Sequence, residues 1–232
     1  MIRYEIKGNG RAVILLHGWG QNMEMMRPIQ DHLAKRYRVL NLDLPGFFGS
    51  DAPASVWGSL EYAAWLHEFA EANQLQEPIL IAHSFGARIA FQYALHYPTA
   101  CMILTGAAGI RKRRTLRYYG KVAFYKARKK LHLPISKSGS EDYRQAQGMM
   151  RKVMVKVVNE TITPDLFKIK TPTLLVWGEQ DEQTPLWMGK MMEKQMPHAT
   201  LVVFHHDDHF AYYHQMPRFL RVIDAYLEGG FL

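Results

Sequence analysis

The chain has 232 residues, of which 48% are hydrophobic and 22% charged, proportions that fit one large globular domain and exclude a disordered or fibrous protein. Its net charge of +8 comes from one segment, because residues 110–156 hold 15 Lys and Arg against 2 acidic residues and the remainder holds 14 against 19. The single cysteine, Cys101, excludes an intramolecular disulfide and a thiolate zinc site. No segment is apolar over the roughly 20 residues that span a bilayer, and residues 1–7 favour a strand over a signal peptide. We therefore expect a cytoplasmic protein.

Short apolar runs alternate with longer amphipathic segments along the chain. Apolar residues without polar alternation indicate strands that are covered on both faces, and they occur at 12–16, 39–42, 79–82, 101–105, 173–176 and 201–204. Apolar residues at helical spacing predict helices at 22–36, 60–73, 85–96, 186–195 and 216–228. This alternation predicts an α/β fold with a mostly parallel central sheet flanked by helices.

Residues 110–164 interrupt this alternation and carry most of the basic excess. Apolar and aromatic residues such as Leu116 and Tyr119 recur there at roughly helical spacing, so we interpret the segment as an inserted helical lid and not as a disordered basic loop. Residues 1–109 and 165–232 would then form the core. The basic charge could receive an anionic substrate, lie as a peripheral helix on an anionic membrane surface, or form a solvated face. Nothing else indicates a groove or stacking platform for nucleic acid, so we expect no such partner.

A serine stands between the apolar run at 79–82 and the helical segment at 85–96, in the sequence Ile81-Ala82-His83-Ser84-Phe85-Gly86-Ala87. A serine at a tight turn from strand to helix adopts a strained backbone and needs small residues two positions on either side, here Ala82 and Gly86. Its hydroxyl would lie at the positive end of the following helix, where developing negative charge is stabilised. The pattern predicts a nucleophile elbow with Ser84 as the nucleophile.

A serine hydroxyl needs a base that takes its proton and an acid that orients the base. Two loops at predicted strand ends offer such groups: carboxylates at Glu179, Asp181 and Glu182, and histidines at His205, His206 and His209. Both loops would open at the carboxyl edge of the sheet, where ligands bind in open α/β folds. The order along the chain is nucleophile, acid, histidine.

Two further motifs accompany the elbow and these loops, His17-Gly18-Trp19-Gly20 and Asp43-Leu44-Pro45-Gly46-Phe47-Phe48-Gly49-Ser50. With them the chain resembles α/β-hydrolases of the esterase, lipase and C–C hydrolase branch over nearly its whole length except the lid. The resemblance implies a catalytic triad of Ser84, Asp181 and His209, because Asp181 matches the family's Trp-Gly-x-x-Asp pattern and His209 its His-Phe pair. It implies that the backbone N–H groups of Trp19 and Phe85 form the oxyanion hole.

The resemblance also assigns structural roles. His17, His83 and Asp43 would stabilise loops or line the pocket, and would not act as acid–base groups. Two residues depart from the family pattern: Phe48 stands in the turn where a glycine is expected, and Ala82 replaces the first glycine of the elbow. Phe48 would narrow the mouth of the pocket, and Ala82 is small enough for the elbow.

The sequence thus predicts a hydrolase of carboxylic esters or related acyl compounds that needs no metal or organic cofactor. The alternative enzyme is a lyase or C–C bond hydrolase for an anionic, carboxylate-bearing small molecule. Arg88 supports it, because it follows Ser84 by one helical turn and resembles the arginine after the elbow in the menaquinone-pathway lyase of this fold. A structural role for Arg88, such as pairing with a carboxylate, is nevertheless the favoured interpretation, because buried arginines usually need such partners. A third hypothesis is a binding or receptor protein that turns over slowly. The sequence leaves the oligomeric state open.

Overall fold

The computed structural model describes residues 1–111, 120, 124, 128, 144 and 146–230. These residues form a seven-stranded sheet in the order β1-β3-β2-β4-β5-β6-β7, in which β1 is antiparallel to β3 and the other neighbouring pairs are parallel. The strands are β1 (Tyr4–Lys7), β2 (Ala12–Leu16), β3 (Arg38–Leu42), β4 (Ile79–His83), β5 (Cys101–Thr105), β6 (Thr173–Gly178) and β7 (Ala199–Phe204). The helices are α1 (Met23–Leu33), α2 (Ser59–Ala72), α3 (Phe85–His96), α6 (Gly148–Asn159), α7 (Trp187–Gln195), α8 (Ala211–His214) and α9 (Met216–Glu228), with a 3-10 helix, η1, at Thr163–Lys168.

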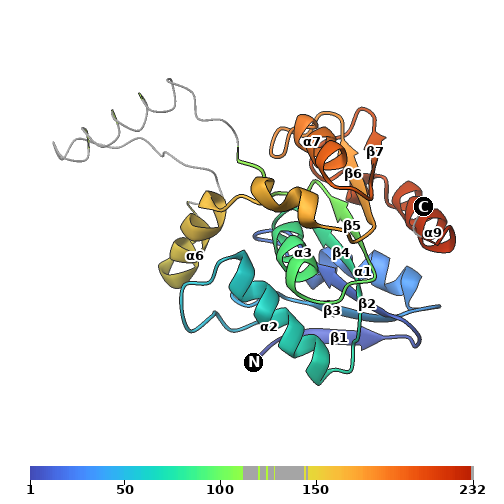
Figure 1. Cartoon of the computed structure of the whole chain (residues 1–232). Coiled ribbons are helices and arrows are strands. Elements are labelled where there is room, and N and C mark those ends of the chain that lie inside the picture. Colours follow the sequence, from blue (N-terminus) through green and yellow to red (C-terminus); the bar gives the residue numbers. More distant parts are fainter. Residues whose placement is uncertain (112–119, 121–123, 125–127, 129–143, 145, 231–232) are drawn as a thin grey trace.

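Helices cover both faces of the sheet (Figure 1). Buried residues of α2, α3 and α7 pack with Ile14 and Leu16 of β2 in one apolar cluster, and those of α1, α8 and α9 pack with Val13 and Leu15 in a second. Successive side chains of a strand point to opposite faces, so the continuous apolar run of β2 supplies both clusters. Truncating one such buried leucine or isoleucine to alanine costs about 2–5 kcal/mol.

The prediction of a mostly parallel sheet flanked by helices is confirmed. Each of the six predicted apolar runs falls inside an observed strand, and the N-terminal residues form β1, the antiparallel edge strand. The predicted helix at 22–36 is shorter at both ends, because the Asn22 side chain caps α1 by accepting a hydrogen bond from Glu24 N at 3.0 Å and residues 34–36 form a turn. β6 extends to Gly178, two residues beyond the predicted apolar run.

The predicted lid at 110–164 lies largely outside the described residues. Its last part is described and contains α6, followed by a contact with the start of α2. There the Glu160 carboxylate accepts hydrogen bonds from the Ser59 amide at 3.0 Å and the Ser59 hydroxyl at 2.6 Å. The boundaries of the lid, and with them the division of the chain at 109 and 165, stay a prediction. Among the described helices none has the length and apolar character needed to cross a bilayer.

Candidate active site

Ser84 lies at the sharp turn between β4 and α3. Its backbone has φ 49° and ψ −105°, a left-handed conformation that is costly for a residue with a Cβ. The turn is held by hydrogen bonds from Ser84 N to Thr105 O at 3.0 Å and from Ala108 N to Ser84 O at 3.1 Å. Gly86 is required because a Cβ there would lie 2.4 Å from the carbonyl oxygen of Leu16. The local geometry is that of a nucleophile elbow.

Asp181 and His209 meet at the carboxyl edge of the sheet, from the loops after β6 and β7. The Nδ1 atom of His209 lies 2.7 Å from Oδ2 of Asp181, and both side chains are buried. The carboxylate accepts further hydrogen bonds, from the amides of Gln183 and Thr184 at 2.8 Å each and from the Thr184 hydroxyl at 2.8 Å. These donors fix the carboxylate. Because Asp181 binds Nδ1 of His209, the other ring nitrogen, Nε2, faces away from Asp181.

The other candidates in these two loops lie elsewhere. Glu179 is exposed and accepts a hydrogen bond from the amide of His206 at 3.2 Å, which together with His205 lowers the pKa of the Glu179 carboxyl. His205 and His206 are exposed beside it. Glu182 is exposed on the surface of the loop. The structure therefore brings together one acid and one histidine of the six candidates.

The His209 ring contacts the ring of His83, the residue before Ser84 at the elbow. The two imidazole rings are 4.7 Å apart between centroids, and Nδ1 of His83 donates a hydrogen bond to Thr105 O at 3.1 Å. Burial, and next the charge that His209 can carry, lower the pKa of His83 well below its usual value. His83 is therefore neutral in the folded protein. Within the described residues the Ser84 hydroxyl has no hydrogen-bond partner, and such bonds often tighten only around substrate.

The loop after β2 places Trp19 against the start of α3. The Trp19 ring contacts the rings of Phe85 and Phe47 edge to face, with centroids 5.2 Å and 4.9 Å away. In the part of the chain that the structure describes, neither the backbone N–H of Trp19 nor that of Phe85 donates to a protein acceptor. The oxyanion hole predicted at Trp19 and Phe85 needs two such unpaired N–H groups, and it stays a prediction.

His17 connects the Trp19 loop to the turn at 43–50. Its Nδ1 donates to the carbonyl oxygen of Gly18 at 2.7 Å, and its Nε2 accepts from the amide of Leu44 at 2.9 Å. A carbonyl can only accept and an amide can only donate, so the ring is neutral with its proton on Nδ1. Burial lowers the pKa of His17 to about 4. His17 is thus a structural residue of this loop.

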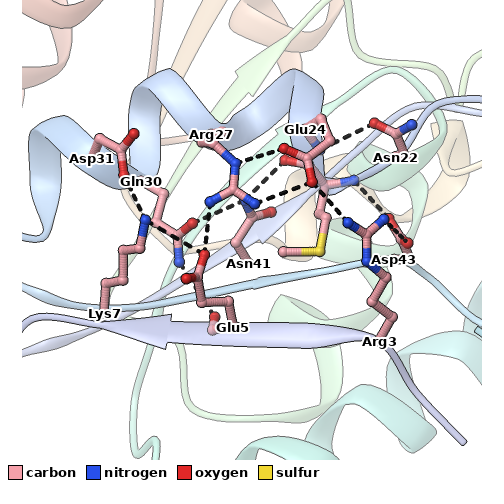
Figure 2. Close-up of polar contacts among 11 residues, drawn as sticks. Arg3, Glu5, Lys7, Asn22, Glu24, Arg27, Gln30, Asp31, Asn41 and Asp43 are labelled. Carbon is pink, nitrogen blue, oxygen red and sulfur yellow. Dashed lines mark hydrogen bonds and ion pairs between the residues drawn. The ribbon is translucent and has the colours of Figure 1, made fainter. Parts of the chain in front are cut away.

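The turn at 43–50 is anchored by the buried carboxylate of Asp43. It accepts hydrogen bonds from Met23 N at 2.7 Å and Gly49 N at 3.2 Å. The Arg3 guanidinium contacts the same carboxylate at 3.2 Å and also reaches Glu24 at the start of α1. Figure 2 shows Arg3, the residue before β1, extending between these two acids. Asp43 therefore joins α1, β1 and the turn, which supports its interpretation as a structural residue.

A cavity of about 290 Å³ opens beside the Trp19 loop. Its lining residues are Trp19, Gly20, Gly46, Phe47, Ala146, Gln147 and Met150. Phe48 is not among them, since 66% of its surface is exposed and its backbone has φ 41°. Its neighbour Phe47 forms the wall instead. Sequence reasoning missed Phe47 and the α6 residue Met150, because the motif shows where the turn lies and not which side chain turns inward.

Arg88 lies away from this cavity. Its guanidinium donates to the backbone carbonyl oxygen of Glu160 at 3.3 Å, and burial lowers its pKa to about 10. Arg88, Ser59, Gln92 and Glu160 border a space of about 10 Å³, which is smaller than a substrate. This placement supports a structural role for Arg88 between α3 and the segment after α6.

Among the residues that the structure describes, one group of side chains has metal-ligand character. Single atoms of Asp207, Asp208 and His214 lie within 4.8 Å of one another. The Asp207 carboxylate already accepts hydrogen bonds from His214 Nδ1 at 2.8 Å and Gln215 Nε2 at 2.8 Å, and these contacts hold the loop that carries His209. The group is explained by those bonds without an ion.

Comparisons with known proteins agree with this geometry. A family profile described as alpha/beta hydrolase fold matches residues 11–119, and one described as TAP-like protein matches residues 143–232. The 2-hydroxy-6-oxo-6-phenylhexa-2,4-dienoate hydrolase of Burkholderia cepacia is 26% identical over 256 residues, which cover 96% of this chain and 90% of that protein. The pimeloyl-acyl-carrier-protein methyl ester esterase of Aeromonas hydrophila is 25% identical over 249 residues, or 95% of this chain and 96% of that protein.

The solved structure of an esterase from Exiguobacterium antarcticum is similar in fold. It is 23% identical, with a TM-score of 0.78 over 98% of this chain and 95% of the esterase. The sheet order, the elbow at Ser84 and the two matching family profiles agree with one another. The chain belongs to the α/β-hydrolase superfamily.

Proposed function

We propose that this chain is a serine hydrolase of carboxylic esters or related acyl compounds, working through an acyl-enzyme on Ser84. The observation that carries the proposal is the buried hydrogen bond between Asp181 and His209 at 2.7 Å, beside a serine at a strained elbow. A buried, hydrogen-bonded pair of this kind holds the imidazole in the tautomer that accepts a proton on Nε2. The superfamily and its enzyme relatives support a hydrolase.

The reaction follows from these roles. The Ser84 oxygen attacks the ester carbonyl while its proton passes to Nε2 of His209, and the carbonyl oxygen becomes an oxyanion facing the N–H groups of Trp19 and Phe85. The tetrahedral intermediate collapses, and the alcohol leaves with the proton from His209. Water then attacks the acyl-enzyme and gives a proton to His209. His209 passes this proton to the departing Ser84 oxygen as the carboxylic acid is released. Asp181 stays ionised and stabilises the imidazolium.

The apolar wall of the cavity beside Trp19 suits the acyl or alcohol part of an ester. It is lined by two aromatic residues, one methionine, one alanine and two glycines, with a single glutamine as the polar side chain. Such pockets bind apolar groups with few polar contacts. The relative from Aeromonas hydrophila is named as an esterase of a methyl ester, which supports ester substrates here.

A fluorophosphonate probe followed by ester hydrolysis tests this proposal. We expect the wild type and Ser55→Ala, a matched change at an exposed serine, to be labelled and to hydrolyse esters, and Ser84→Ala to do neither. Equal labelling of Ser84→Ala and the wild type would refute the assignment of the nucleophile. Short- and long-chain p-nitrophenyl esters compared in the same assay define the acyl length.

A second candidate is a C–C bond hydrolase or lyase of the same fold acting on an anionic substrate. It is favoured by the relative that is named as a dienoate hydrolase, whereas the contact of Arg88 with Glu160 weakens it. We expect Arg88→Met to leave the preference between neutral and carboxylate-bearing substrates unchanged. A selective rise in KM for the anionic substrate would instead support this second candidate. A role for the basic segment at membranes stays a prediction.

A further inference from the structure

The backbone conformation at Gly18 sets the direction of the Trp19 N–H. The carbonyl of Gly18 and the N–H of Trp19 belong to one planar trans peptide, so they point in opposite directions. Whatever holds the Gly18 oxygen on one side therefore aims the Trp19 N–H to the other. The oxyanion hole of the proposed reaction depends on that direction.

Both peptide groups that flank the Gly18 Cα are held by hydrogen bonds. The Gly18 oxygen accepts from His17 Nδ1 at 2.7 Å and from the backbone amide of Gln21 at 3.2 Å. On the other side, the Gly18 amide donates to the side-chain oxygen Oε1 of Gln21 at 3.1 Å. Gln21 thus contacts both peptides, one with its backbone and one with its side chain.

Packing favours a glycine at position 18, and a glycine also leaves the backbone at this position flexible. A Cβ there would lie 2.9 Å from Cδ2 of His83 and 2.9 Å from Nε2 of Gln21, so a larger residue does not fit unless these side chains shift. Glycine has the least restricted backbone of all residues. The side chain of Gln21 fills the space beside Gly18 and at the same time binds its amide, which limits the freedom that glycine brings.

We propose that Gln21 is a positioning residue that aims the Trp19 N–H at the oxyanion. The proposal rests on the proposed function, since it gives the N–H a reaction to serve. Gln21 acts through Gly18 and is not in contact with the reacting atoms. Its contribution is therefore greatest when the oxyanion has formed, and its loss lowers kcat and leaves KM nearly unchanged.

The test compares Gln21→Met with Asn22→Ala. Methionine keeps the length of the side chain and removes the oxygen that accepts from Gly18. Asn22→Ala changes the adjacent residue, whose side chain caps α1 through Glu24, and so lowers stability without touching Gly18. Should Gln21→Met not fold, Gln21→Asn keeps the amide and shortens the side chain so that it cannot reach.

Two measurements separate the local contact from its catalytic effect. We expect the Gly18 amide of Gln21→Met to exchange its hydrogen about five- to tenfold faster by NMR, the effect of one neutral hydrogen bond. We also expect kcat to fall about tenfold, less than the 10²–10³ that follows complete loss of an oxyanion donor. The affinity for a trifluoromethyl ketone, whose adduct carries the oxyanion, should fall by the same factor. Asn22→Ala should lower Tm and leave exchange, kcat and inhibitor affinity unchanged.

The outcomes are distinct. Unchanged exchange at Gly18 in Gln21→Met overturns the proposed contact, whether or not the protein is an esterase. Faster exchange with kcat and inhibitor affinity within twofold of the wild type overturns the positioning role. Equal losses of kcat in Gln21→Met and Asn22→Ala assign the effect to stability and also overturn it. Absence of ester hydrolysis and of Ser84 labelling in the wild type refutes the proposed function instead.

Discussion

Acid should destabilise this protein through His17 well before the carboxylates are neutralised. The ring is fully buried, and its Nε2 accepts a hydrogen bond from the Leu44 amide at 2.9 Å. Protonation would place an N–H on the ring against the N–H of the backbone, where the two donors repel. Burial in the native state is the main cause that lowers the pKa of His17 from 6.5 to about 4.

The size and sign follow from linkage. Between pH 6.5 and about 4 the unfolded chain binds a proton at His17 that the native chain does not, so the free energy of unfolding falls as the pH falls. The shift corresponds to a total loss of about 3 kcal/mol, at a limiting slope of about 1.4 kcal/mol per pH unit. Above pH 6.5 the contribution is constant, and below about pH 4 no further loss arises from this residue. His83, whose pKa is also lowered by burial, adds a loss of the same sign.

Urea unfolding at pH 7.5, 6.5, 5.5 and 4.5 measures this loss in the wild type and in His17→Asn. The variant loses the buried contacts and is less stable at pH 7.5, but it has no ring to protonate. The difference between the two free energies of unfolding should therefore shrink by about 2.5 kcal/mol between pH 7.5 and 4.5. His198→Asn makes the same substitution at an exposed histidine and controls for the loss of a histidine as such. A difference that stays constant across this range would refute the reasoning.

Two further predictions concern the acid loop and the glycines. Asp181→Asn should lower kcat by on the order of 10³–10⁴-fold with little change in KM, because an amide holds His209 in the wrong tautomer. A rise in KM as large as the fall in kcat, measured by steady-state kinetics, would contradict this. Gly178→Ala should cost about 3 kcal/mol of unfolding free energy, since its Cβ would lie 1.9 Å from the carbonyl oxygen of Asp208. The matched change Gly120→Ala, with nothing within 4 Å of the added Cβ, should be neutral or stabilising by up to about 1 kcal/mol. Equal Tm values for the two variants would show that the close contact at position 178 does not lower stability.

The sequence by itself determined the features that depend on near neighbours in the chain. Six of the seven strands are visible as apolar runs, because a strand covered on both faces has no polar alternation. The elbow at Ser84 is visible too, since the residues two positions away must be small for the backbone to adopt φ 49°. These features depend on local sterics and local burial, so the order of residues is enough to predict them.

The resemblance to the family selected Asp181 over Glu179, but only the tertiary structure shows the physical reason for that choice. Both carboxylates lie in one loop and carry the same charge, so their difference arises from partners outside it: His209 for one and His206 for the other. Arg88 shows the same limit. Its spacing from Ser84 left a place near the substrate open beside the favoured structural role. The structure shows its guanidinium at the carbonyl of Glu160, a residue far along the chain.

The hydrogen bonds of Gln21 had no signal in the sequence at all. A glutamine after a glycine is an ordinary loop residue. The side chain of Gln21 has a role only because the loop after β2 lies next to the elbow, with Gly18 packed against His83. Apolar periodicity repeats along the chain and can be read from it. A hydrogen bond made once between two side chains or loops is fixed by the packing of the strands, and the order of residues alone does not contain it.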